Sequence, residues 1–147
     1  TVAAFVFWDL DYAGSTNNDQ RVRYDSIAGD INDFFNDEHR TRMGIDFSQQ
    51  LEQFVLWGNG GRLYYLTPPA GKPTSTNGWH IERVEPTGSA RPMTRDELNN
   101  DGGSGVGIFG KWKYAADLGC FIGLQHALNG DVWLYKPRNW VDPRTLS

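Results

Sequence analysis

Apolar residues along this chain fall into short runs with turn-forming residues between them, a pattern that predicts strands rather than long helices. Residues 2–8 make a mostly apolar run, which is typical of a strand buried on both faces. Residues 20–24 and 79–84 alternate polar and apolar side chains, as half-buried strands do. Residues 131–135 form a last clear strand.

The middle of the chain predicts a β-hairpin. Apolar runs at residues 54–57 and 63–66 flank the tight-turn sequence Gly58-Asn59-Gly60-Gly61. A further strand is expected over residues 108–114. The segment at about 85–107 is long, polar and rich in glycine, so we expect a mobile loop there.

Two segments show the spacing of an amphipathic helix, residues 26–39 and residues 115–128. Ser26 or Asp30 can cap the first helix, because a short oxygen-bearing side chain accepts from the free N–H groups of a helix start. Asn129-Gly130 would end the second helix.

The composition favours a β-rich fold, either all-β or α+β. Strands and turns prefer aromatic residues and glycine, and 14% aromatic residues with 17 glycines exceed what a helical bundle needs. A length of 147 residues fits a single domain, which we place over residues 1–147. The net charge of −4 and the absence of a basic run argue against a dedicated nucleic-acid binder.

Other features of the sequence bear on where the protein is located. No apolar run in the sequence approaches the roughly 20 residues of a membrane helix. The single Cys120 excludes an internal disulfide. The composition favours an extracellular location only slightly and leaves the compartment open.

The stretch Gly105–Lys111 matches part of a phosphate-binding loop. Such a loop needs Ser or Thr after the lysine and a buried strand before the glycines. Trp112 follows the lysine here, and the preceding residues are polar. We therefore expect a glycine-rich loop that enters a strand.

Two further groups of residues carry candidate chemistry. Asp9 and Asp11 alternate with Leu10, so on a strand both carboxylates face one way and can share a divalent cation; the alternative is that they are solvated turn residues. Four tryptophans can form a carbohydrate- or protein-binding face if they are exposed, or belong to the core if they are not. They are Trp79, Trp112, Trp133 and Trp140.

Phe7 to Gly14 resembles the opening of a βγ-crystallin Greek key, an aromatic residue followed by six residues and a glycine. The resemblance implies a Greek-key sandwich with one or two short helices. That family's calcium signature is met at five of six positions by Asn100-Asp101-Gly102-Gly103-Ser104-Gly105. It implies that Asn100, Asp101 and Ser104 bind Ca²⁺, together with backbone carbonyls, waters or another loop, because calcium takes six to eight oxygen ligands.

The same first strand is also similar to that of NYN domains, the PIN-like metal-dependent ribonucleases. The similar residues are Phe7-Trp8-Asp9-Leu10-Asp11 and, later, Lys113-Tyr114-Ala115-Ala116-Asp117. This resemblance implies an α/β fold with Mg²⁺ held by Asp9, Asp11 and Asp117. The acidic element that this family carries after its next strand does not stand at residues 136–140.

The first interpretation is therefore a non-catalytic binding module for calcium, carbohydrate or protein. The alternative is a metal-dependent ribonuclease, and only this alternative makes nucleic acid a partner. Both interpretations rest in part on residues of the first predicted strand, and neither identifies the ligand.

Overall fold

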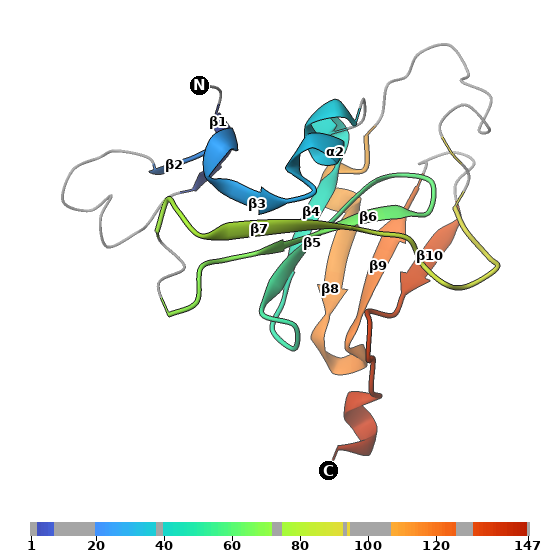
Figure 1. Cartoon of the computed structure of the whole chain (residues 1–147). Coiled ribbons are helices and arrows are strands. Elements are labelled where there is room, and N and C mark those ends of the chain that lie inside the picture. Colours follow the sequence, from blue (N-terminus) through green and yellow to red (C-terminus); the bar gives the residue numbers. More distant parts are fainter. Residues whose placement is uncertain are drawn as a thin grey trace.

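A computed structural model describes residues 3–7, 20–37, 40–71, 75–92, 94, 107–125 and 131–146 of the chain. Its strands form three sheets, with the orders β1-β2, β3-β7-β6-β5-β4 and β10-β9-β8 (Figure 1). The strands are β1 Ala3–Phe7, β2 Gln20–Arg23, β3 Ile27–Gly29, β4 Gly44–Ser48, β5 Gln53–Asn59, β6 Arg62–Thr67, β7 Trp79–Val84, β8 Trp112–Ala115, β9 Cys120–Leu124 and β10 Val132–Tyr135. The helix α2 spans Ile31–Asn36, and short 3₁₀ turns are η1 Tyr24–Ser26, η2 Arg40–Arg42, η3 Phe109–Lys111, η4 Ala116–Leu118 and η5 Pro143–Thr145.

The five-stranded sheet grows from the predicted hairpin. Strands β5 and β6 pair antiparallel, and the turn between them holds Gly60 at a φ of +55°, a left-handed conformation that glycine adopts without strain. Strands β4 and β7 continue the meander on either side, and β3 pairs parallel with β7. The hairpin and the strand over residues 79–84 are thus confirmed.

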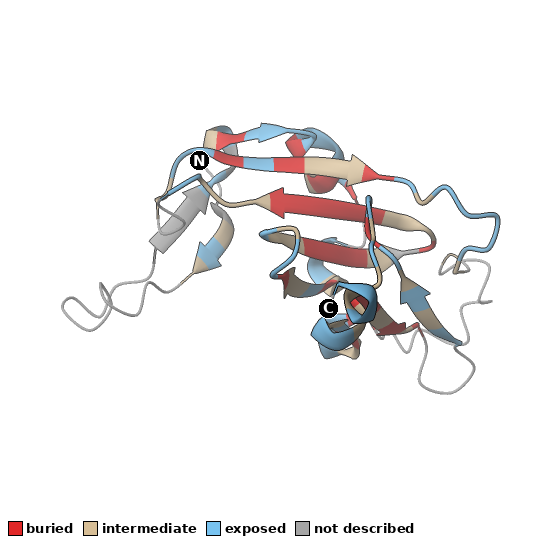
Figure 2. Ribbon diagram, turned by 90° about the horizontal axis from the view of Figure 1, so that it is seen from below, coloured by how far each residue is buried: buried red, intermediate tan, exposed pale blue. Residues whose placement is uncertain are grey.

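This sheet is buried on both faces, because successive side chains of a strand point to opposite sides. One face packs under α2 and β1 around Leu56, Tyr64 and Ile81. The opposite face packs against the three-stranded sheet, through Val55 and Tyr65 among others. Buried residues accordingly gather along the strands between these layers (Figure 2).

The predicted helix over residues 26–39 is shorter than expected. Residues 27–29 form β3, which Gly29 ends at a φ of +88°, and α2 follows with Ile31 and Phe34 buried. Asp30 precedes the helix but does not cap it with its side chain. Its carboxylate instead accepts from the backbone N–H of Arg83 at 2.8 Å, which anchors the helix start to β7.

The predicted helix over residues 115–128 is wrong. In the described part of this range, residues 115–125, only the η4 turn is helical, and residues 120–124 form β9 between β8 and β10. Gly119 adopts a left-handed φ of +59°, and glycine at 119 and 123 lowers helix propensity. The apolar spacing also fits a strand, since Phe121 and Gly123 face the core while Ile122 and Leu124 point the other way.

The described strands and the single described α-helix confirm the β-rich expectation. Their pairings are two meanders, the antiparallel pair β1–β2 and the parallel pair β3–β7, and none has the antiparallel 4-1-2-3 order of a Greek key. They also do not form the parallel sheet with intervening helices that the α/β alternative needs. No helix in the described ranges is long and apolar enough to cross a membrane.

Candidate binding groove

A groove of about 770 Å³ lies between β7 and β10. One wall is the end of β7 with the segment that follows it, and the other is β10 with residues 136–139. Trp57, Leu63 and Trp112 from the sheet interior line its base. The volume lies in the range of small-molecule sites, and we name this feature the β7–β10 groove.

Aromatic rings can pack at the base of this groove because residue 123 is a glycine. Trp112, Gly123 and Trp133 stand in one cross-strand row of the three-stranded sheet. A Cβ at Gly123 would lie 2.4 Å from Cζ3 of Trp57, so the missing side chain is what lets the indole of Trp57 enter from the facing sheet. The rings of Trp57 and Trp112 consequently pack with centroids 5.1 Å apart.

Trp133 brings an unused hydrogen-bond donor to the groove. Its ring is half-buried, and its Nε1 is buried without a hydrogen-bond partner among the described residues. The other four described tryptophans all donate to backbone oxygens. These bonds are Trp57 to Gly60, Trp79 to Ser75, Trp112 to Val55 and Trp140 to Leu118, at 2.7–3.0 Å. Buried N–H groups are nearly always paired, so the Nε1 of Trp133 is the exception among these five tryptophans.

A polar cluster borders the groove next to Trp133. The hydroxyls of Tyr65 and Tyr135 lie 2.5 Å apart, and burial, followed by this hydrogen bond, raises the pKa of Tyr135. Arg138 donates to Glu82 at 2.6 Å, and its guanidinium lies 5.1 Å from the centroid of the Tyr65 ring. These contacts join β6, β7 and β10 and hold the two walls in place.

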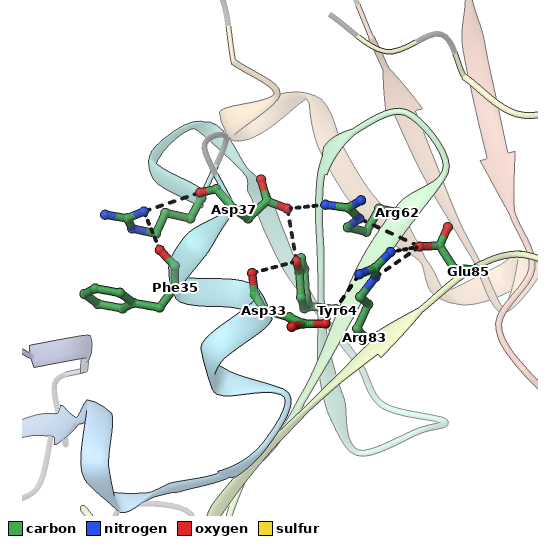
Figure 3. Close-up of polar contacts among 8 residues, drawn as sticks. Asp33, Phe35, Asp37, Arg62, Tyr64, Arg83 and Glu85 are labelled. Atoms are coloured by element: carbon green, nitrogen blue, oxygen red, sulfur yellow. Dashed lines mark hydrogen bonds and ion pairs between the residues drawn. The ribbon is translucent and has the colours of Figure 1, made fainter.

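Charged side chains tie the opposite wall to α2 (Figure 3). Arg83 donates to Glu85, at the start of the wall segment, at 2.7 Å and reaches Asp33 of the helix at 3.4 Å. Arg62 also approaches Glu85 at 3.7 Å. The wall is therefore positioned by side chains from both β6 and β7.

Asp37 extends this network into the interior. Its carboxylate is 3% exposed and accepts from the hydroxyl of Tyr64 at 3.0 Å and from Arg62 at 3.5 Å. Burial, and then the negative charge of Asp37, raises the pKa of Tyr64. Tyr64 thus stays protonated and acts as a donor, which gives the network a structural role.

The four sequence-predicted tryptophans do not form one exposed face. Trp79 is 5% exposed and lies on the α2 side of the five-stranded sheet, while Trp112 is 1% exposed and belongs to the core on the other side. Strand alternation turns both rings inward. Trp133 and Trp112 both line the groove, whereas Trp140 lies outside it with the ammonium of Lys136 at 3.8 Å from its ring centroid.

The remaining predicted site residues are spread widely or lie outside the described residues. Asp117 is exposed in η4, away from the groove lining. Asp9 and Asp11, and also Asn100, Asp101 and Ser104, fall outside the described residues. Within the described ranges no three His, Cys, Asp or Glu side chains cluster so that they could hold a metal ion. The loop expected at 85–107 is described at 85–92, 94 and 107, where it contains no helix or strand.

Gly105–Lys111 ends as the sequence indicates, in a turn that enters a strand. Lys111 closes η3 directly before β8, and no helix begins there. Its Nζ is buried with no hydrogen-bond partner among the described residues, and burial lowers the pKa of Lys111.

Sequence reasoning missed Gly123, Tyr135 and the Glu82–Arg138 pair. The signal that was available was strand alternation within residues 120–124 and 132–135, which places Gly123 and Tyr135 on one face. Nothing in the sequence alone indicates the pairing of Glu82 with Arg138, because 56 positions separate them.

No protein-family model matches the chain, and neither the curated proteins nor the solved structures contain a match to it. The two resemblances drawn from sequence therefore stay predictions.

Proposed function

We propose that this chain is a non-catalytic binding module that holds a peptide segment of a partner protein in the β7–β10 groove. The observation that carries the proposal is the unpartnered N–H of Trp133 at an aromatic groove. Once the ring turns enough to uncover this N–H, a ligand oxygen that accepts from it would remove the energetic penalty of an unpaired buried donor.

The lining favours binding over catalysis. Its described residues include no His, Cys or Ser, and its two carboxylates, Glu82 and Glu85, are each ion-paired with an arginine. Paired carboxylates of this kind position the walls and are poorly placed to move protons.

The lining also favours a protein ligand. Protein interfaces concentrate binding energy in tryptophan, tyrosine and arginine, and all three residue types line this groove. Because the arginines already bind carboxylates, few free polar groups remain for the many hydroxyls of a carbohydrate, whereas a peptide can supply apolar side chains for the aromatic base.

Selection from a phage-displayed library of random peptides tests the proposal. The enriched pool is measured on the wild-type chain and on Leu134→Asp, which puts a charge on a groove residue that is 62% exposed and so leaves the core intact. The matched control is Ile45→Asp, on the exposed edge strand β4 outside the groove lining.

We expect peptides to be enriched, to bind Ile45→Asp normally, and to bind Leu134→Asp about tenfold more weakly or worse, a loss of about 1.4 kcal/mol. A library that yields no peptide, or equal binding to both variants, would show the proposal to be wrong. If a glycan from a panel binds the wild-type chain instead, and binds Leu134→Asp more weakly, the proposed peptide ligand is wrong.

Calcium binding by Asn100, Asp101 and Ser104 stays a separate prediction, as does the ribonuclease alternative with Asp9, Asp11 and Asp117. Neither draws support from the described part of the chain, where Asp117 is exposed. The peptide groove depends on neither of them.

A further inference from the structure

Strand β10 is the edge of the three-stranded sheet, and the groove runs beside it. Among the described strands it pairs only with β9, so one side of its backbone has no strand partner. Figure 1 shows the segment that follows β7 passing this side of the sheet, and Trp133, Leu134 and Tyr135 are consecutive residues of the groove lining. An edge strand with a groove alongside it is a template for another extended chain.

The pairing with β9 identifies which backbone groups of β10 face the groove. The N–H of Gln125 donates to the carbonyl of Asp131, so these two residues form a hydrogen-bonded pair. Such pairs alternate along an antiparallel ladder, which places Trp133 and Tyr135 in the next two. The N–H and C=O groups of Val132 and Leu134 therefore point to the open edge.

The opposite wall does not compete for these groups. Pro86 and Pro92 stand in it, and proline has no N–H to give to a ladder. Its described residues 85–92 contain no strand. Within the described residues, therefore, this wall forms no ladder with the backbone of Val132 and Leu134.

Side chains around the edge indicate the chemistry of the occupant. Val132 and Leu134 are 66% and 62% exposed, so apolar side chains would gain contact there. On the other face, the N–H of Trp133 calls for an acceptor. Lys136 also lines the groove, but its ammonium lies 3.8 Å from the centroid of the Trp140 ring, outside the groove lining, so this charge is not directed at the occupant.

We propose that the groove binds its partner by strand addition, with an extended segment pairing with β10 as a fourth strand of the sheet. This inference rests on the proposed function. The backbone of Val132 and Leu134 supplies the ladder, apolar side chains of the segment contact the exposed side chains of Val132 and Leu134, and Trp133 binds an acceptor. Main-chain pairing gives affinity in this mode of recognition, and alternate side chains give specificity.

The test is an N-methyl scan of a peptide selected from the library. N-methylation removes one backbone donor at a time, and a strand-added peptide uses every second N–H. We expect methylation at alternate positions to weaken binding at least about fivefold, as the loss of one hydrogen bond implies, and the intervening positions to tolerate it.

Leu134→Pro provides the complementary change in the chain. It removes an N–H that β9 does not use, and an edge position accepts proline, so circular dichroism should stay native while peptide binding falls. If every position of the peptide tolerates N-methylation and binding is still weakened by Leu134→Asp, strand addition is wrong but the proposal of a peptide-binding groove is not. Failure to select any peptide would instead overturn the proposed function.

Discussion

Replacing Gly123 with alanine tests whether the two sheets are packed as tightly as the structure shows. The new Cβ would lie 2.4 Å from Cζ3 of Trp57 and 2.7 Å from Cε3 of Trp112. Carbon atoms in contact are normally about 3.5–4.0 Å apart, so both indoles must move, each by about 1 Å. Neither ring has room to move freely, since they are 2% and 1% exposed and each donates a hydrogen bond to the backbone.

Overpacking of this kind typically costs about 1–3 kcal/mol. Alanine also stiffens the unfolded chain, which returns about 0.4–1 kcal/mol. The expected net loss in the free energy of unfolding is thus about 1–2 kcal/mol. For a chain of this size that lowers Tm by roughly 2–8 °C.

Equilibrium urea unfolding, followed by tryptophan fluorescence, measures the loss. Gly110→Ala is the matched control, because a Cβ there meets nothing within 4 Å, and its unfolding free energy should change by less than about 0.5 kcal/mol. If Gly123→Ala is as stable as Gly110→Ala, the tight approach of Trp57 to the three-stranded sheet is wrong, and with it the base of the groove.

Three other predictions follow from single groups. Tyr64 and Tyr135 have pKa values raised above the ordinary 10.0, so these tyrosines lose their protons at lower pH in the unfolded chain than in the folded one. The free energy of unfolding should therefore fall as pH rises above about 10. The fall should be smaller in Tyr64→Phe, and an equal fall would contradict the burial of Tyr64. Trp133→Phe should destabilise the chain less than Trp112→Phe in urea, because only Trp112 is fully buried and donates a hydrogen bond, and the reverse order would contradict the unpaired state of Trp133. Calorimetric titration with Ca²⁺ should release heat that Asp101→Asn abolishes, and no heat from the wild-type chain would end the calcium prediction.

Much of the strand architecture could be predicted because its signals are local. The turn at Gly60-Gly61 and the apolar runs on either side of it define the β5–β6 hairpin within a few residues. The same locality misled at residues 115–128, where apolar positions fit both a helical period and a strand period. There the left-handed Gly119 and the cross-strand partners of Phe121 decide the structure, and those partners come from β8 and β10.

The groove could not be predicted because it is built from contacts between distant residues. Tyr65 and Tyr135 are 70 positions apart, and the burial of Trp112 depends on a carbonyl 57 positions away in β5. Trp133 was one of four tryptophans proposed from the sequence. What distinguishes it is the unpartnered Nε1, which only the packed structure reveals.

The indole N–H resonance of Trp133 directly tests whether a peptide binds at Trp133 in the β7–β10 groove. It is assigned in a ¹H–¹⁵N spectrum by its loss in Trp133→Phe, and the wild-type chain is then titrated with a peptide selected from the library. We expect this resonance to move downfield with bound peptide, as an N–H does when it gains an acceptor, while that of Trp79, on the other face of the sheet, stays in place. A peptide that binds without moving the Trp133 resonance would show that Trp133 does not take part in binding.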